Sequence, residues 1–394
     1  MDILYLSPCP PNPPDKGERI RAFHTIGYFG ARCRVHLACF VRSGDEAEKA
    51  RAMSDQCASI YVEQVSKYSA LASAALRFAM GGCLTTSYYS SSRLKRYAED
   101  LAQRVPLAAT VVYSSAMFPM APPGVPILLD MSDVDSEKWL QYAEMRRPSF
   151  IFAAEGRRLR ELEIRFVRAA KSTVVMTEQE AALLAGIVPG APIKYLENGV
   201  DYSRFDPARC AALPALEGRR FLVFVGMMNY YPNVDAVDWF ARQVFPELRR
   251  RDPGLEFLIV GREPAKAVLD LQSIPGVQHI VPAGGVEAYL AASAGVVAPL
   301  RLARGIQNKV LEGLAMGKRV FSSPAICGTL GEHLPAGVVR CETEADYIQA
   351  ISGAKIEAGA FDPQIRLAAM ERFSWPKALE GLFAEVLAVR RTLG

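Results

Sequence analysis

The stretch PLRLARGIQNKVLEGLAMGK, residues 299–318, is the most informative part of this sequence. It reads as the end of a strand, a loop, a helix and a closing glycine, Gly317. The unpaired N–H groups in the first turn of such a helix, together with the helix dipole, form a seat for a diphosphate. Gly305 would let the backbone approach that ligand closely. The stretch therefore predicts an anion site that needs no metal ion.

Two charged residues on this predicted helix suggest what the anion belongs to. Lys309 and Glu312 are three residues apart and therefore share one helix face. The ammonium group can meet phosphate oxygens, and the carboxylate can accept hydrogen bonds from ribose hydroxyls. This arrangement suits a nucleotide, although an exposed Lys–Glu pair that supports its own helix explains the spacing equally well.

The same alternation of strand and helix extends in both directions along the chain. Short apolar runs bounded by turn residues predict strands, and the segments between them have helical periodicity. The first set of strands is expected at residues 3–6, 35–40, 60–62, 110–113, 127–130 and 173–176. The second set is expected at residues 221–225, 257–260, 277–281, 295–298, 320–322 and 338–340. The pattern predicts two parallel α/β domains in succession.

The boundary between the domains is expected in the stretch ENGVDYSRFDP, residues 197–207, where Asn-Gly and Asp-Pro mark a turn and a stop. We expect an N-terminal domain at residues 1–200 and a nucleotide-binding domain at residues 201–372. Residues 373–394 should form a helix that packs back toward the N-terminal domain. Because open parallel sheets bind ligands at the carboxyl ends of their strands, two such domains would enclose a cleft.

Two of these motifs resemble the retaining glycosyltransferases of family 4, and the resemblance spans nearly the whole chain. That family has the GT-B fold, two facing Rossmann-like domains with parallel sheets and an interdomain cleft. Its signature is a pair of glutamates separated by seven residues; Glu312 matches the second, whereas Arg304 replaces the first. Residues 198–207 look like the family's interdomain hinge. The resemblance implies sugar transfer from a nucleotide diphosphate sugar, with retention of configuration.

A closer resemblance is to the sugar transferases associated with exosortase and PEP-CTERM exopolysaccharide systems. It rests on ARGIQNKVLE at residues 303–312, and on residues 14–21, 133–139 and 226–237. It implies a role in exopolysaccharide biosynthesis, with a saccharide or a polyprenyl-linked acceptor.

Three further residues are assigned to the donor. A guanidinium group prefers phosphate oxygens, so Arg304 is expected to grip the diphosphate and assist catalysis, the alternative being a solvated loop residue. Gly226, after a strand of the second domain, permits close approach of the backbone. Gly17, after the first strand, is expected to touch the transferred sugar or the β-phosphate, unless it only punctuates a tight turn.

Asp133 is the candidate catalytic residue on the acceptor side. It follows the strand expected at residues 127–130, where it could orient or deprotonate the acceptor hydroxyl; the alternative is a helix cap. The spacing of Asp133 and Asp135 invites comparison with a metal-binding D-x-D element. We do not expect a metal, because the diphosphate already has a helix terminus.

Composition excludes several other classes of protein. The chain of 394 residues has 46 basic and 42 acidic residues, which are interspersed and give no nucleic-acid footprint. Eight cysteines without a C-x-x-C pair argue against zinc knuckles and disulfide frameworks, so a reduced, cytoplasmic protein is expected. No cofactor is expected besides the donor substrate. Residues 68–97 combine apolar and basic side chains, which suit either an ordinary solvated helix face or peripheral contact with the inner face of the plasma membrane.

The sequence thus predicts a cytoplasmic, metal-independent glycosyltransferase. Two alternatives stay open. A nucleotide-sugar epimerase can be built on the same two-domain fold, and Arg304 in place of Glu, with Ser132 where many family members have His, would also suit a non-catalytic nucleotide-sugar binding protein.

Overall fold

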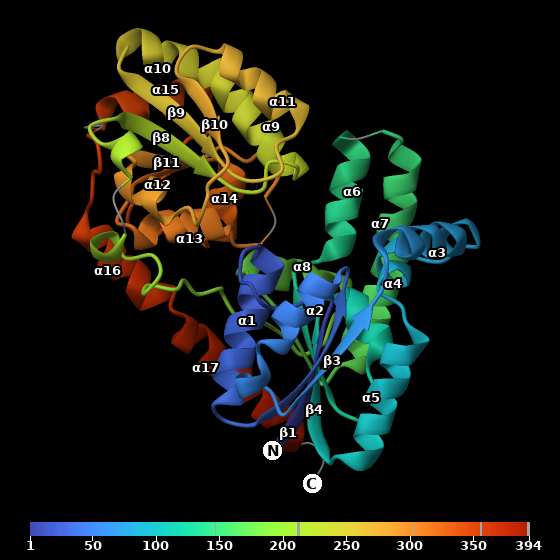
Figure 1. Cartoon of the computed structure of the whole chain (residues 1–394). Coiled ribbons are helices and arrows are strands. Elements are labelled where there is room, and N and C mark those ends of the chain that lie inside the picture. Colours follow the sequence, from blue (N-terminus) through green and yellow to red (C-terminus); the bar gives the residue numbers. More distant parts are fainter. Residues whose placement is uncertain (146, 211–212, 304, 355–356, 392–394) are drawn as a thin grey trace. The chain divides into compact units, whose positions relative to one another are not determined.

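The protein forms two compact units in a computed structural model that describes residues 1–145, 147–210, 213–303, 305–354 and 357–391 (Figure 1). The first unit comprises Met1–Glu197 and Pro376–Gly394, and the second comprises Asn198–Trp375. The chain passes from the first unit to the second after Glu197 and returns to the first unit after Trp375. Val200 and Ser374, both in the second unit, form a parallel β-bridge, so the two crossing segments run side by side.

The first unit is built on a seven-stranded sheet in the order β3-β2-β1-β4-β5-β6-β7, in which every pairing is parallel. Its strands are β1 (Asp2–Ser7), β2 (Arg34–Val41), β3 (Ser59–Gln64), β4 (Leu107–Tyr113), β5 (Ile127–Ser132), β6 (Ser172–Val175) and β7 (Ile193–Tyr195). Six of them coincide with expected strands. The edge strand β7 was not expected, because its three residues include the exposed Lys194 and Tyr195 and make no apolar run.

The first unit also contains helices. They are α1 (Gly17–Gly30), α2 (Gly44–Arg51), α3 (Lys67–Ala79), α4 (Leu84–Tyr88), α5 (Ser92–Arg104), α6 (Asp135–Met145), α7 (Ser149–Ala169), α8 (Glu178–Ile187) and α17 (Trp375–Arg391). The last of these returns from the far end of the sequence. Phe383 of α17 packs with its ring centroid 5.3 Å from that of Phe29 in α1, and Glu385 accepts hydrogen bonds from Ser172 Oγ at 2.9 Å and Lys194 Nζ at 2.5 Å.

The second unit has a six-stranded parallel sheet in the order β10-β9-β8-β11-β12-β13. Its strands are β8 (Arg220–Val225), β9 (Leu255–Val260), β10 (Val277–Ile280), β11 (Gly295–Ala298), β12 (Val320–Ser322) and β13 (Val338–Arg340). Its helices are α9 (Tyr231–Trp239), α10 (Phe245–Arg251), α11 (Lys266–Asp270), α12 (Glu287–Ala292), α13 (Asn308–Ala315), α14 (Pro324–Thr329), α15 (Glu344–Gly353) and α16 (Pro363–Arg372). All six strands match expected ones.

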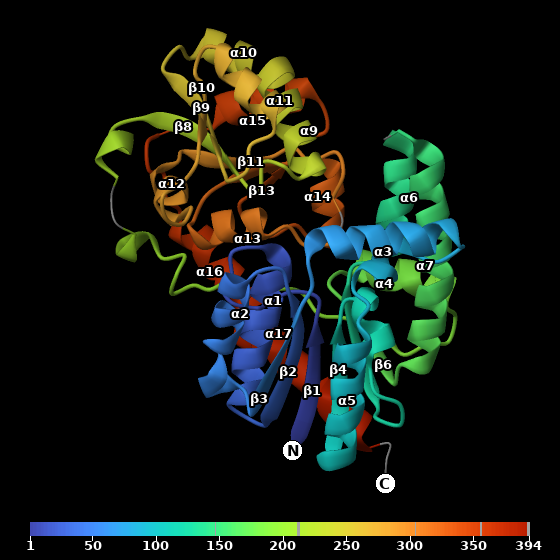
Figure 2. The ribbon, with the colours of Figure 1, turned by 45° about the vertical axis from the view of Figure 1, so that its right-hand side comes forward.

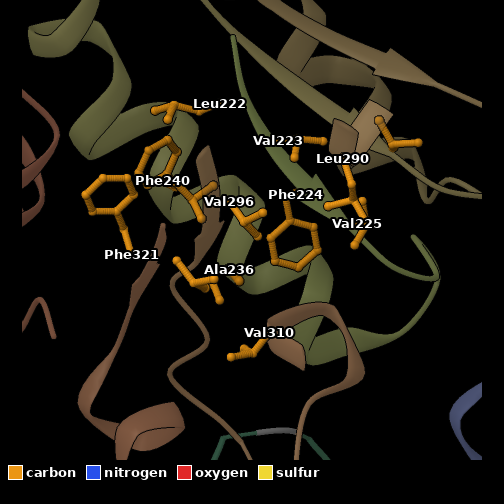
Figure 3. Packing of buried hydrophobic residues seen from close by; sticks show 14 of the residues in the cluster. Leu222, Val223, Phe224, Val225, Ala236, Phe240, Leu290, Val296, Val310 and Phe321 are labelled. Atoms are coloured by element: carbon orange, nitrogen blue, oxygen red, sulfur yellow. The ribbon is translucent and has the colours of Figure 1, made fainter. Parts of the chain in front are cut away.

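The core of the second unit shows why its strands read as unbroken apolar runs. Residues 221–225 of β8 are buried, because helices cover both faces of a parallel sheet. Figure 3 shows Phe224 of β8 and Val310 of α13 in the same hydrophobic cluster. Gly313 lets α13 lie directly on the sheet, since a Cβ there would stand 2.9 Å from Val296 Cγ2.

Both sheets therefore have the doubly wound topology expected of Rossmann-like domains. The strand order reverses between β1 and β4 in the first unit and between β8 and β11 in the second. Ligands of such sheets bind beside the carboxyl ends of the strands at this reversal. Among the described helices, none has the length and apolar character that crossing a bilayer demands.

Candidate functional site

The stretch at residues 299–318 folds as the sequence predicts. It leaves β11, which pairs with β8 at the reversal, and continues into α13, whose first residue is Asn308. Gly305 has a φ of 60° and Gly317 one of 64°, values that favour glycine. Gly317 N donates to Leu314 O at 2.9 Å and Lys318 N donates to Gly313 O at 3.0 Å, which closes the helix with a Schellman motif. Arg304 lies outside the described residues.

Lys309 is buried in the first turn of α13 and is not an exposed helix-surface residue. Its side chain is 8% exposed, and Nζ lies 5.0 Å from the centroid of the Phe224 ring. Nζ donates hydrogen bonds to Asn233 Oδ1 at 3.0 Å and to Gln307 Oε1 at 3.4 Å. Burial lowers the pKa of Lys309 to about 8, although the nearby Glu312 acts in the opposite direction. The burial does not fit the alternative of an exposed Lys–Glu pair.

Asn233, which the sequence analysis did not single out, connects two loops of this site. It lies in the first turn of α9, and its Nδ2 donates to Met227 O at 2.9 Å in the loop after β8. Its Oδ1 accepts the hydrogen bond from Lys309 described above. The side chain thus joins the loop after β8 to the helix after β11. Asn233 lies within the motif at residues 226–237, and that position could have marked it as a site residue.

Glu312 lies one turn further along α13. Burial raises its pKa to about 7, the positive charges of Arg204 and Lys309 lower it, and the negative charge of Glu287 raises it. Arg204 itself forms an ion pair with Glu287 of α12. The carboxyl group therefore changes its charge near neutral pH, where Lys309 is mostly protonated.

Gly226 is explained by packing inside the protein. A Cβ at Gly226 would stand 2.7 Å from Asn233 Nδ2, and a Cβ added at the neighbouring Gly261 would stand 1.8 Å from Gly226 O. A side chain at Gly226 would therefore displace the Asn233 amide, whether or not a ligand is bound. Arg301, which follows β11, contacts the same helix as Asn233, because Arg301 Nε donates to Asp235 Oδ2 of α9 at 2.9 Å.

The other two candidates, Gly17 and Asp133, belong to the first unit. Gly17 is the first residue of α1, whereas Asp133 follows β5. Their segments are joined by a buried ion pair that the sequence analysis missed, in which Arg21 Nε of α1 lies 2.8 Å from Asp130 Oδ2 of β5. Arg21 is 1% exposed and Asp130 is fully buried.

The loop at Asp133 is held by two glutamates from neighbouring helices. Val134 N donates to Glu180 Oε2 at 2.7 Å, and Ser136 N donates to Glu163 Oε1 at 3.2 Å. Burial raises the pKa of Glu163 to about 8, and the charge of Asp135 adds to this shift. These two buried carboxyl groups therefore satisfy N–H groups at the start of α6.

The described residues contain no group of three or more His, Cys, Asp or Glu side chains placed to hold a metal ion. The D-x-D spacing of Asp133 and Asp135 therefore does not assemble such a cluster within the described part of the chain. All eight cysteines are free thiols.

Comparison with known protein families finds a match within the second unit. Residues 219–354, which include Gly226, Asn233, Lys309 and Glu312, match the family described as "Glycosyl transferases group 1". This part of the chain is therefore similar to the glycosyltransferase group 1 domains. No curated protein matches the chain significantly.

Several solved structures are similar in fold to the whole chain. A glycosyltransferase from Rickettsia africae is 14% identical, with 98% of each chain covered and a TM-score of 0.63. Sucrose-phosphate synthase from Thermosynechococcus elongatus is 11% identical, with 98% of this chain and 99% of that chain covered and a TM-score of 0.70. HepE from Anabaena, in complex with UDP and glucose, is 13% identical, with 98% and 99% covered and a TM-score of 0.64. The fold class is therefore GT-B, as expected.

Proposed function

We propose that the protein is a metal-independent glycosyltransferase that moves a sugar from a nucleotide diphosphate sugar to a saccharide or polyprenyl-linked acceptor. We further propose that it acts with retention, in exopolysaccharide biosynthesis, in the cytoplasm and without a cofactor. The observation that carries the proposal is the buried Lys309, whose Nζ meets the neutral oxygens of Asn233 and Gln307 within the glycosyltransferase domain.

A buried ammonium group that faces neutral oxygens keeps its positive charge available for an anion. Lys309 stands in the first turn of α13, where the unpaired backbone N–H groups and the helix dipole also favour negative charge. A diphosphate bound there would stabilise the protonated lysine. Arg304, four residues before α13, is proposed to add a second cation, which would take over the charge balance that a divalent metal provides elsewhere.

Glu312 is proposed to accept hydrogen bonds from the ribose hydroxyls. Its ionised form would make charge-assisted bonds, each contributing about 1.5–3 kcal/mol. Because HepE was solved with UDP and glucose, uridine nucleotides are the first donors to test.

On the acceptor side, Asp133 is proposed to orient or deprotonate the attacking hydroxyl, and Gly17 to touch the sugar or the β-phosphate. The Arg21–Asp130 pair fixes the segments that carry both residues. Catalysis would then rest on stabilisation of the leaving diphosphate and on orientation of the reactants.

The experiment is a donor screen. The purified protein is incubated with a panel of UDP-, GDP- and dTDP-sugars, with and without a membrane extract as source of acceptor. Release of nucleotide diphosphate and conversion of the donor sugar are measured together. We expect release that depends on the extract, and we expect it to survive EDTA.

Each alternative gives a different result in that screen. Conversion of the donor sugar without nucleotide release would identify an epimerase, and donor binding without turnover would identify a non-catalytic binder. Activity that EDTA abolishes and magnesium or manganese restores would overturn the metal-independent mechanism alone.

A further inference from the structure

Helix α3 of the first unit presents its larger apolar side chains to solvent. Its buried residues are two alanines, Ala70 and Ala74. One continuous stripe on the exposed part of α3 and its C-cap consists of Tyr68, Leu71, Ala72, Ala75, Leu76, Ala79 and Met80, all exposed. Tyr68 is 83%, Leu76 64% and Met80 71% exposed. Surface helices of globular proteins normally have the opposite arrangement.

The outward orientation of this stripe is fixed by contacts with α7. Arg158 of α7 donates to Phe78 O at 2.8 Å and to Gly82 O at 2.9 Å, and its guanidinium carbon lies 4.4 Å from the centroid of the Phe78 ring. Figure 2 shows α3 lying across α7. Since the end of α3 is tied down in this way, the helix cannot simply roll to bury the stripe.

The hairpin formed by α6 and α7 adds further exposed apolar residues. Met145, at the end of α6, is 40% exposed, and Phe150, at the start of α7, is 72% exposed. Phe150 lies about two helical turns from Arg158 along the same helix. Both side chains belong to the α6–α7 hairpin, to which Arg158 attaches the end of α3.

The charge of this region points to an anionic partner. Residues 65–98 contain five basic residues and no acidic residue. They are Lys67, Arg77, Arg93, Lys95 and Arg96; all five are exposed, and Arg93 is paired with Glu63 at 3.1 Å. Lys67 and Arg77 lie on α3 itself, next to the stripe. Basic side chains beside an exposed apolar stripe are typical of helices that lie in the interface of an anionic bilayer.

The size of the stripe argues against a second copy of the chain as the partner. A helix of 13 residues is about 20 Å long, so the stripe offers on the order of 200 Å², against about 800 Å² per partner in a stable protein interface. Two such surfaces would also bring basic residues face to face.

We propose that α3 is a membrane-docking helix, whose apolar stripe inserts into the surface of an anionic lipid bilayer while Lys67 and Arg77 contact the headgroups. The proposal goes beyond the proposed function, because it holds whether or not the protein transfers a sugar.

The test is co-sedimentation of the full chain with vesicles of phosphatidylglycerol, compared with vesicles of phosphatidylcholine. We expect binding to the anionic vesicles that weakens as salt is added. The double variant Leu76→Glu/Met80→Glu should lower the partition coefficient at least about tenfold, because each substitution removes buried apolar area and adds a repelled charge. Lys67→Glu/Arg77→Glu should lower it as well.

The matched control is Leu367→Glu/Met370→Glu, which places the same two charges on exposed side chains of α16 in the second unit, Leu367 being 53% and Met370 39% exposed. It should sediment like the parent. The positions changed on α3 are exposed, so thermal melting should show that all variants remain folded. Equal binding by the parent and by Leu76→Glu/Met80→Glu would overturn the proposal. So would a change in oligomeric state in that variant with no binding of the parent to anionic vesicles, which would make another copy the partner.

Discussion

Arg21 of the first unit and Lys309 of the second are both buried cations, and their hydrogen-bond partners differ in charge. In the first unit, Arg21 lies 2.8 Å from the carboxylate of Asp130. In the second, Lys309 Nζ lies 3.0 Å from the amide oxygen of Asn233. Burial acts to lower the pKa of both groups. For Arg21 the charge of Asp130 outweighs this effect, so its pKa is raised. The pKa of Lys309 falls to about 8.

The difference separates a cation that stabilises the fold, Arg21, from a cation that can bind an anionic ligand, Lys309. Arg21 is neutralised within the protein and joins α1 to β5. Lys309 has only neutral oxygens within hydrogen-bond distance among the contacts described, so its burial has a cost that a bound anion would offset. Four substitutions test this contrast, from the largest expected effect to the smallest.

Asp130→Asn should be the most damaging change, because it leaves the buried Arg21 guanidinium without its counter-charge. Breaking a buried ion pair costs about 3–5 kcal/mol of unfolding free energy. Urea denaturation measures the loss. Lys266→Ala, which removes an exposed ion pair with Asp270, is the control and should unfold like the parent. Equal stability of Asp130→Asn and Lys266→Ala would contradict the structural role.

Lys309→Met should weaken binding of a nucleotide diphosphate sugar by about tenfold to a hundredfold, because a charge-assisted contact to phosphate is lost. Binding of the free nucleoside should change little. Stability of the unliganded protein should stay the same or rise, since a disfavoured buried charge has been removed. Calorimetry with both ligands and a thermal melt provide the readouts. Unchanged affinity for the donor would show that the anion site lies elsewhere.

Asn233→Asp would give Lys309 a carboxylate partner, as Arg21 has in Asp130. The new carboxylate should raise the pKa of Lys309 and compete with the diphosphate, so donor affinity should fall by roughly tenfold. In the parent, affinity should decline above about pH 8 as Lys309 loses its proton. In the variant this decline should move to higher pH. A decline at the same pH in both proteins would separate Lys309 from donor binding.

Glu312→Gln tests the residue that titrates beside Lys309. The folded pKa of Glu312, about 7, lies above its ordinary value, so its neutral form stabilises the fold at low pH and this contribution is lost as pH rises through 7. The Gln variant should therefore melt higher than the parent above pH 7 and show no such gain in acid. Donor affinity of the parent should rise as Glu312 ionises, whereas the variant should bind several-fold more weakly and lack this rise. A parallel pH profile in the two proteins would contradict the ribose assignment.

Much of the fold was predictable because parallel strands leave a clear trace. Helices on both faces demand unbroken apolar runs, and twelve strands were found in this way, whereas the exposed β7 has no such run. For the candidate site, the sequence predicted only which residues lie on the same segment of the chain. The sequence placed Lys309 and Glu312 on one helix, but the partner of Lys309 comes from α9 and that of Arg21 from β5. Contacts between segments that are distant in the sequence depend on tertiary packing. So does the orientation of α3, which buries two alanines and exposes its larger apolar side chains. Local sequence patterns do not determine either.

The return of α17 to the first unit bears on how the protein is made. Residues 1–197 are translated before α17. The surface around Phe29 that Phe383 contacts therefore stays uncovered until α17 has been made. The second unit, Asn198–Trp375, is a continuous segment and holds all its own strands. Domains fold as units during synthesis, generally in order from the N-terminus. In this protein the second unit can complete its fold before the first unit does. Until α17 is made, the first unit keeps an apolar surface exposed.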